Sequence, residues 1–174
     1  AIANLKAARA LSPKKIYALT HDELAQLIHP TGYFNVKARR LRAFVDTLVE
    51  QHGASLKRMF KGDTATVRER LIAINGVGPE TADSMLLYAG GHHSFVIDAY
   101  TKRIFERHEW CETDADYDEL QSLCTSSLSQ KHAAAKLDYW RDYHGQLVAI
   151  GNLYCKPRNP RCEECPLQSL LPAN

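Results

Sequence analysis

Three groups of residues in this chain have types and spacings that can support chemistry. Asp98 follows the apolar pair Val96-Ile97 and stands where a helix N-cap is expected, before "AYTKRIFERH". The segment Gly76-Val77-Gly78 interrupts a helical pattern that resumes at Pro79. The third group is a C-x6-C-x2-C pattern near the end of the chain, formed by Cys155, Cys162 and Cys165. Together these residues offer a carboxylate, an exposed loop backbone and a set of thiol ligands.

The glycine segment predicts a tight connection between two helices. Glycine permits positive φ and lacks the Cβ that would keep a ligand away from the backbone, and Pro79 suits the first position of a helix. The N–H groups at the start of that helix have no intrahelical acceptor, so they can seat a phosphate. We expect Val77 to pack inward. An ordinary helical hairpin with C-cap glycines is the alternative.

Four segments carry a family resemblance. The stretch Ile74 to Ala82, "INGVGPETA", followed by Val96-Ile97-Asp98, resembles the helix-hairpin-helix DNA glycosylases of the endonuclease III superfamily. The other three segments match the family's helix start, the helix before its iron–sulfur loop and that loop itself: "HPTGYFNVKARRLRAF" (29–44), "YHGQLVAIGNLYC" (143–155) and "CKPRNPRCEECPL" (155–167). The resemblance spans nearly all 174 residues in order.

This resemblance implies excision of a damaged base from double-stranded DNA, with the base flipped into a cleft. Asp98 matches the family's catalytic aspartate, a carboxylate that stabilises positive charge on the sugar and orients or deprotonates water. A pure N-cap role is the alternative, and both can hold at once. The residues expected to contact DNA are Gly76, Val77, Gly78, Thr81, Lys37 and Arg40.

Glu80 stands where bifunctional members of the family carry a lysine. That lysine forms a Schiff base that permits strand cleavage, and a carboxylate cannot form an imine. The sequence therefore favours a monofunctional glycosylase, and "GVGPETAD" also resembles the hairpin of endonuclease III-like 3-methyladenine glycosylases, which remove alkylated purines. The alternatives are a bifunctional enzyme for oxidised pyrimidines, a non-catalytic helix-hairpin-helix module, and Glu80 as a plain surface residue.

The cysteine loop lacks one ligand of the family's pattern. The fourth cysteine would fall at residue 171, which is Leu171, whereas a [4Fe–4S] cluster ordinarily takes four thiolates. Three alternatives remain open: a cluster with a foreign or distant fourth ligand, a zinc site, or a loop that has lost its metal. A cluster would be structural, presenting Lys156, Arg158 and Arg161 to phosphates. Two further cysteines, Cys111 and Cys124, fit apolar helix surfaces and are expected to be buried.

Several other side chains have both a functional and a structural interpretation. Tyr33 and Phe34 could line a damage pocket, but packing is favoured. Lys102 could serve as a substitute amine one helical turn after Asp98, but a phosphate contact or ion pair is favoured. His144 lies in an apolar helix and is expected to be a core histidine rather than a ligand. A basic set could contact the DNA backbone or form a solvated face: Lys37, Arg39, Arg40 and Arg42.

The elements that must position these residues read as short helices, which makes the fold class all-α. We expect the two-lobed helix-hairpin-helix glycosylase architecture with a C-terminal iron–sulfur-type loop. Residues 20–130 would form the hairpin lobe, and residues 1–19 plus 131–174 the second lobe, with the hairpin facing Asp98 across a cleft. The helical patterns cover residues 13–19, 21–29, 36–52, 63–74, 79–89, 99–107, 116–130 and 132–150.

Composition agrees with a DNA partner and excludes several classes. The net charge is +2, but residues 1–60 hold 10 Lys and Arg against 4 Asp and Glu, a basic third that suits a polyanion. A hydrophobic content of 45% supports a folded core, and no apolar run suggests a membrane span. The odd cysteine count fits a reduced metal site better than disulfides, so we expect a cytoplasmic, DNA-associated monomer. The chain starts without Met, and we expect it to be part of a longer protein. The resemblance implies that the chain begins partway into the family's first domain helix.

Overall fold

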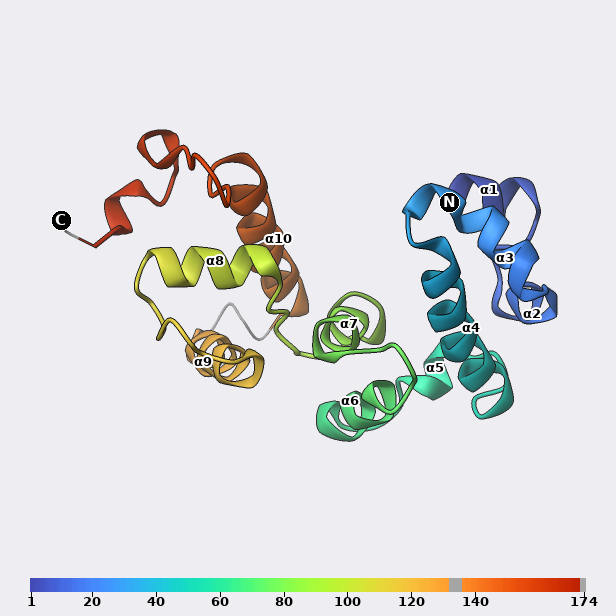
Figure 1. Cartoon of the computed structure of the whole chain (residues 1–174). Coiled ribbons are helices and arrows are strands. Elements are labelled where there is room, and N and C mark those ends of the chain that lie inside the picture. The colour runs from blue at the N-terminus through green and yellow to red at the C-terminus, as the bar shows by residue number, and fades with distance from the viewer. Residues whose placement is uncertain (132–135, 173–174) are drawn as a thin grey trace. The chain divides into compact units, whose positions relative to one another are not determined.

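The computed structural model describes residues 1–131 and 136–172, and every regular element in those ranges is helical (Figure 1). The all-α prediction is confirmed. The helices in chain order are α1 (Ile2–Ala7), α2 (Pro13–Ala18), α3 (His21–Ile28), α4 (Phe34–Glu50), α5 (Leu56–Met59), α6 (Thr64–Ile72), α7 (Pro79–Met85), α8 (Ala99–Arg107), α9 (Tyr117–Ser129) and α10 (Leu137–Leu153). Short helical turns add η1 (His29–Thr31), η2 (Leu86–Gly90), η4 (Cys162–Glu164) and η5 (Gln168–Leu170). No helix in these described ranges could span a membrane.

Helix starts follow local side-chain chemistry. The Thr20 side chain accepts a hydrogen bond from the Glu23 backbone N–H, and the Glu23 carboxylate accepts one from the Thr20 backbone N–H, which is the capping box that the sequence predicts. A second capping box, Asp116 with Glu119, begins α9. At the start of α6, the Asp63 side chain accepts a hydrogen bond from the Thr66 backbone N–H at 2.9 Å. These contacts satisfy N–H groups that a helix cannot satisfy itself, and they explain why the boundaries could be predicted.

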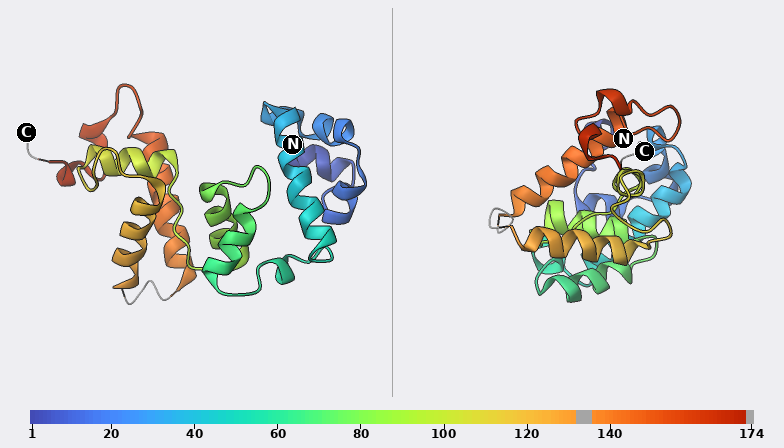
Figure 2. Two further views of the ribbon diagram at one scale, coloured as in Figure 1. Left: turned by 60° about the horizontal axis from the view of Figure 1, so that its bottom comes forward. Right: turned by 90° about the vertical axis from the view of Figure 1, so that its left-hand side faces the viewer.

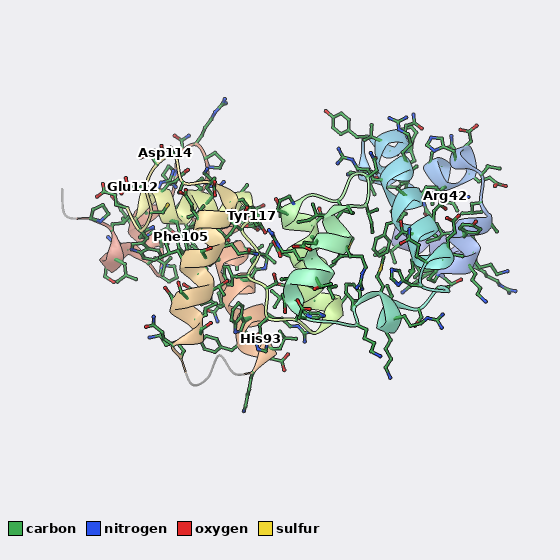
Figure 3. The ribbon with its side chains drawn as sticks, turned by 90° about the horizontal axis from the view of Figure 1, so that it is seen from below. Arg42, His93, Phe105, Glu112, Asp114 and Tyr117 are labelled. Atoms are coloured by element: carbon green, nitrogen blue, oxygen red, sulfur yellow. The ribbon has the colours of Figure 1, made fainter. Side chains whose placement is uncertain are left out.

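The chain divides into two compact units, residues 1–78 and residues 79–174. In the first unit, α2 and α3 pack against α4 around a small apolar core. Arg42, labelled in Figure 3, ties this unit together: its Nη1 donates to the Leu19 carbonyl at 2.6 Å and its Nε to Asp46 at 2.6 Å. The predicted division into lobes of 20–130 and 1–19 plus 131–174 stays a prediction.

The second unit is built around the packing of α8 against α10. Figure 2 shows α8, α9 and α10 grouped in this unit, and each contributes to one apolar cluster. The predicted helix over 132–150 is observed from residue 137 to residue 153, and residues 132–135 of that prediction lie outside the described residues. The fully buried members of the cluster include Leu87, Phe95, Val96, Ile104 and Leu120.

Helix α7 does not end where a regular α-helix would. Its hydrogen bonding widens into one π-helical turn over Leu86–Gly90, and Gly91 then reverses the chain at φ +78°. A single π turn inside a helix occurs frequently at functional sites, because it shifts the direction of the side chains on that turn. Tyr88 lies in this turn, half exposed.

A buried carboxylate holds the segment between the π turn and α8. Asp83 is completely buried, and it accepts hydrogen bonds from Ser94 Oγ at 2.6 Å and Tyr117 Oη at 2.8 Å. Tyr117, labelled in Figure 3, also accepts from the Ile97 backbone N–H at 3.4 Å. The Gln121 amide donates to the Phe95 carbonyl at 2.9 Å. This non-helical segment therefore leads into α8 in a defined conformation.

We predict that Asp83→Ala lowers the free energy of unfolding by about 2 kcal/mol or more, because the buried hydroxyls of Ser94 and Tyr117 lose their acceptor. Denaturant unfolding would measure the change. Asp138→Ala is the matched control, since Asp138 is a surface carboxylate paired with Arg141 and 84% exposed. It should change the free energy of unfolding by less than about 0.5 kcal/mol. Equal effects of the two substitutions would contradict a special role for Asp83.

Candidate functional site

Asp98 is the N-cap of α8, as the sequence predicts. Its Oδ1 accepts a hydrogen bond from the Thr101 backbone N–H at 2.8 Å, and its side chain is only 14% exposed. Burial by itself raises the pKa of Asp98, but the neighbouring His144 imidazole and the hydrogen bond from the Thr101 N–H more than offset this, so the pKa lies below its ordinary value. The positive end of the α8 dipole acts in the same direction. Asp98 is therefore a fixed, largely buried and ionised carboxylate at neutral pH.

His144 lies beside Asp98, which the sequence analysis did not foresee. The expectation of a core histidine is correct in that the residue is buried and its Nδ1 lies 2.6 Å from the Tyr88 hydroxyl. Its Nε2, however, faces Asp98 Oδ2 at 3.7 Å, an ion-pair distance rather than a closed hydrogen bond. No sequence signal links the two residues, because they are 46 positions apart on different helices. Only the packing of α8 against α10 brings them together.

Lys102 is engaged in structural contacts. Its Nζ donates to the Ala115 carbonyl at 3.0 Å and lies 3.8 Å from Glu106 Oε1. The ion pair that the sequence analysis favoured is therefore present. An ammonium held in this way is not poised as a nucleophile.

The two hairpin glycines differ in their surroundings. Gly76 adopts φ +85°, and a Cβ there would lie 2.3 Å from the Arg40 side chain. Gly76 is therefore required by its own backbone conformation and by close packing against α4. Gly78 has a different character, because a Cβ there would meet nothing within 4 Å and its φ is not positive. The described structure contains no steric reason for glycine at residue 78.

The residues around the glycines separate into buried and exposed groups. Val77 is buried at 8% exposure, as expected, and its N–H donates to the Ile74 carbonyl at 3.0 Å. Glu80 and Thr81 are exposed in the first turn of α7. Their place on the surface is compatible with contact to a ligand, and the DNA-binding role of Thr81 stays a prediction.

The basic residues of α4 also separate. Lys37, Arg39 and Arg40 are exposed, with Lys37 Nζ donating to the Thr31 carbonyl at 2.6 Å. Arg42 belongs to the internal contacts of the first unit and not to a free basic face. Arg40 is the member of this set that packs against the hairpin, through Gly76.

The two aromatic residues before α4 behave differently from each other. Phe34 packs against the core of the first unit and lies 4.5 Å from the His29 ring, which agrees with the favoured packing role. The predicted packing role is wrong for Tyr33, whose side chain is 87% exposed and whose backbone adopts the left-handed conformation at φ +47°. Tyr33 caps α4 from a conformation that non-glycine residues rarely adopt, so its ring is directed into solvent rather than into the core.

Cys155, Cys162 and Cys165 line one small pocket, together with Leu171 and residues of α8. Arg107 Nη1 donates to Cys155 Sγ at 2.9 Å, and hydrogen bonds to sulfur are one means by which proteins tune iron–sulfur clusters.

The other two cysteines lie away from this loop. Cys124 is buried and Cys111 is partly buried. Burial raises the pKa of Cys124 to about 12, with a smaller contribution from Cys111.

Three cysteines line the pocket, one thiolate fewer than a [4Fe–4S] cluster ordinarily takes. Leu171, at the family's fourth cysteine position, lines the pocket but offers no ligand. His108 also lines it, yet both of its ring nitrogens face carbonyl oxygens, at 2.8 Å and 3.4 Å. Across residues 1–131 and 136–172, no three His, Cys, Asp or Glu side chains are already grouped closely enough to hold a metal ion. Lys156, Arg158 and Arg161 are exposed on the loop, with Arg161 paired to Glu164.

The structure thus brings together Gly76 with Arg40, the three loop cysteines around one pocket, and Asp98 with His144. The predicted arrangement in which the hairpin faces Asp98 across a cleft stays a prediction.

Comparison with known protein families agrees with these features. Residues 1–130 match the family described as HhH-GPD superfamily base excision DNA repair protein. Residues 155–170 match the iron-sulfur binding domain of endonuclease III.

Individual proteins show the same similarity. A protein of Methanocaldococcus jannaschii assigned as a DNA repair glycosylase is 39% identical over 170 residues, covering 97% of this chain and 74% of that protein. Endonuclease III of Bacillus subtilis is 26% identical over 158 residues, covering 91% of this chain and 65% of that enzyme. The crystal structure of H. pylori 3-methyladenine DNA glycosylase bound to 1,N6-ethenoadenine superposes with a TM-score of 0.71 at 27% identity, covering 87% of this chain and 74% of that one.

The family match covers most of this chain, and it includes the segments that carry the hairpin glycines and Asp98. The Methanocaldococcus jannaschii relative is similar over almost the whole of this chain, which extends the resemblance beyond the segments that carry the motifs. The chain therefore belongs to the HhH-GPD superfamily of base excision DNA repair proteins, as an endonuclease III-like DNA glycosylase.

Proposed function

We propose that this protein is a monofunctional DNA N-glycosylase that excises a damaged, alkylated base from duplex DNA by hydrolysis. The observation that carries the proposal is Asp98, an ionised carboxylate fixed at the start of α8 and largely shielded from water. Binding of DNA alone does not require such a residue. Burying a charge costs free energy unless the charge is well paired and hydrogen-bonded, so a buried and incompletely paired carboxylate favours a functional role.

Asp98 would act on the sugar. Breaking the N-glycosidic bond sends the bonding electrons out with the base and leaves positive charge on the sugar. A preorganised carboxylate in a poorly solvated site stabilises that charge strongly, because little reorganisation is needed during the reaction. The attacking water then forms the new bond to the sugar carbon, and its proton passes to Asp98 or onward to solvent.

Glu80 supports the monofunctional assignment. It is exposed at the position of the family's lysine, and a carboxylate cannot form the imine that strand cleavage by β-elimination requires. Lys102 is the amine nearest to Asp98 in sequence on α8, and it is held by Ala115 and Glu106. Water is therefore the proposed nucleophile.

The substrate class follows from leaving-group chemistry and from the hairpin motif. The "GVGPETAD" segment is similar to that of endonuclease III-like 3-methyladenine glycosylases, and the solved H. pylori enzyme of that name is among the similar structures. Alkylated purines that carry positive charge leave readily and need little acid assistance. The described site accordingly supplies a carboxylate for the sugar and requires no strong acid for the base.

The hairpin would hold the DNA backbone. Gly78 is exposed and free of internal contacts at its Cβ position, which leaves its backbone open to close approach by a phosphate. Arg40 and Lys37 supply positive charge from α4, and Arg40 packs on Gly76 of the same hairpin. Thr81 adds a hydroxyl donor in the first turn of α7. We propose duplex DNA as the partner.

The cysteine loop is proposed to hold a [4Fe–4S] cluster through Cys155, Cys162 and Cys165, with a ligand from outside the protein at the fourth iron. When bound, such a cluster would supply structural order to the loop rather than chemistry at Asp98. Arg103 already connects α8 to this loop, since its Nε donates to the Cys155 carbonyl at 2.6 Å. A zinc ion is the second candidate occupant.

We predict that Asp98→Asn lowers the single-turnover rate of excision about a hundredfold or more, equivalent to roughly 3 kcal/mol in the transition state. Asn is as good an N-cap as Asp, so α8 and DNA affinity should survive. The assay uses duplexes with 3-methyladenine, ethenoadenine and oxidised pyrimidines. Alkali should be needed to cleave the product strand, and borohydride should not trap an adduct. Near-native excision by the variant would remove Asp98 from the mechanism, and efficient trapping would show an amine nucleophile.

For the hairpin, Gly78→Val should weaken binding to damaged and undamaged duplexes alike. A valine side chain would block close approach of a phosphate without disturbing the free protein, because nothing lies within 4 Å of the new Cβ. The salt dependence of binding should become shallower by about one phosphate contact. Fluorescence anisotropy at several salt concentrations measures both effects, and thermal unfolding checks that the variant is folded. Unchanged affinity would make residues 76–78 an ordinary turn.

Protein purified without oxygen should be brown, contain iron and absorb in the thiolate-to-iron charge-transfer region. Leu171→Cys should slow the loss of iron in air, because it supplies the fourth thiolate in a pocket that residue 171 already lines. Leu170→Cys is the control, since Leu170 is exposed and absent from that pocket's lining. Colourless wild-type protein that contains one zinc per chain would favour zinc, and metal-free protein would show that the loop has lost its metal.

A further inference from the structure

We propose that His144, held by Tyr88, is a positioning residue that orients the Asp98 carboxylate and steadies its negative charge for the reaction. The inference rests on the proposed function of Asp98 as the carboxylate that faces the sugar. It adds two residues, from two other elements, to a site that otherwise consists of a single side chain on α8.

Three separate elements of the second unit converge at this point. Tyr88 comes from the π turn η2, Asp98 from the start of α8 and His144 from the middle of α10. Tyr88 Oη lies 2.6 Å from His144 Nδ1, and His144 Nε2 lies 3.7 Å from Asp98 Oδ2. The imidazole therefore stands between a phenol and a carboxylate, with one ring nitrogen directed at each.

The His144 nitrogen that faces Asp98 makes no hydrogen bond within the described residues. His144 is 7% exposed, and its Nε2 is buried without a hydrogen-bond partner among the described residues. Leaving a buried polar nitrogen unsatisfied is costly, so such groups in native proteins usually mark function or motion. The Asp98 carboxylate is the acceptor in front of it. A movement of less than one ångström would turn 3.7 Å into a normal hydrogen bond.

Tyr88 selects the useful form of the ring. Burial, followed by the charge of Asp98, raises the pKa of Tyr88, which keeps the phenol protonated and able to donate. When Oη donates to Nδ1, a neutral imidazole must carry its proton on Nε2, the nitrogen directed at Asp98. Tyr88 contacts His144 from the π turn Leu86–Gly90, and single π turns inside helices occur frequently at functional sites.

Packing also keeps the imidazole in place. The Phe95 ring meets it edge-on at 6.1 Å and 89° between planes, and the Tyr88 ring lies at 5.8 Å. Arg141 Nε donates to the Leu87 carbonyl at 3.0 Å, which ties the π turn to α10 next to His144. The ring is thus enclosed by contacts from three sides before any substrate arrives.

Charged and titratable groups surround His144 on each element that packs against it. Asp98 faces His144 from α8, and Tyr88 faces it from η2. Arg141 and Asp142, both on α10, act on Tyr88 with opposite signs, the arginine lowering its pKa and the aspartate raising it. The carboxylate of Asp98 is the anion closest to the imidazole, so it receives the main benefit of a donor at Nε2.

The decisive experiment compares single-turnover excision by three folded variants across a range of pH. His144→Phe keeps an aromatic ring but removes both nitrogens, and Tyr88→Phe removes only the hydroxyl that fixes the ring. Tyr143→Phe is the matched control, since Tyr143 is a partly buried tyrosine of α10 that also packs on Phe95. We expect about a tenfold or greater loss of rate at neutral pH for His144→Phe. Tyr88→Phe should lose less, and Tyr143→Phe nothing.

The pH profile separates positioning from simple packing. Activity requires ionised Asp98, so the rate falls as pH drops through the pKa of that carboxyl. Removing the His144 imidazole takes away one of the groups that lower the pKa of Asp98 and leaves the Thr101 hydrogen bond in place, so the pKa of Asp98 rises. The acidic limb of the profile should therefore move to higher pH in His144→Phe, and DNA affinity should not change. A lower rate with an unmoved acidic limb would overturn the proposal and leave His144 a packing residue.

A measurement without DNA tests the positioning role of His144 separately from the proposed glycosylase function. In nitrogen-15 NMR of histidine-labelled protein, His144 should carry its proton on Nε2 when neutral, and Tyr88→Phe should reduce that preference. Asp98→Asn should shift the His144 resonances. If Asp98→Asn retained excision but these shifts appeared, the contact between Asp98 and His144 would be real and the proposed catalytic role of Asp98 would be wrong. If His144 did not respond to either substitution, the positioning role would be rejected. Tyr88, half exposed, also keeps the test available if His144→Phe does not fold.

Discussion

A negative charge held out of water at the start of α8 is the constraint on which the second unit depends. Burial opposes the ionisation of Asp98, and three features favour the ionised form: the imidazole of His144, the Thr101 N–H at 2.8 Å and the helix dipole. Each requires a particular backbone to be in a particular place. A carboxylate that is buried, ionised and incompletely paired is unusual in a core and expected in an active site, because its free side remains available to a developing cation.

The surrounding structure can be understood as support for that position. Asp83, deeper in the same unit, fixes Ser94 and Tyr117, and through them the segment that enters α8. Gly151 allows α10 to approach α8 closely, since a Cβ there would lie 2.5 Å from the Tyr100 side chain. Arg103 then joins α8 to the Gly151 and Cys155 carbonyls. The cysteine loop and the helix that begins at Asp98 are consequently parts of one packed structure, so the proposed metal in the loop would help to hold that helix in place.

The hairpin shows how identical residues can be present for different reasons. Gly76 is constrained from within, by φ +85° and by the Arg40 side chain. Gly78 is sterically unconstrained in the described structure, which is compatible with the proposed approach of a phosphate to its backbone. The sequence motif treats both glycines alike, and the difference between them appears only when the space around each is measured.

The sequence by itself determined the local features of this protein. Helix starts at Thr20, Asp63 and Asp98 are written in short-range capping chemistry, and the apolar periodicity is enough to establish an all-α fold. It also located the carboxylate, the hairpin and the three cysteines, because each is a short motif. The sequence did not predict the details of packing. Tyr33 was expected to pack and is exposed, and the π turn at Leu86–Gly90 could not be separated from a regular helix.

Only the tertiary structure decided what stands next to Asp98. Tyr88, Asp98 and His144 belong to three elements, and no local pattern records that η2, α8 and α10 meet at one point. The same holds for Leu171, whose presence in the cysteine pocket depends on how the final turns fold back. The physical reason is common to both cases. Capping and periodicity are interactions between neighbours in the chain, whereas the environment that sets a carboxylate's charge is built from contacts whose partners lie tens of residues apart.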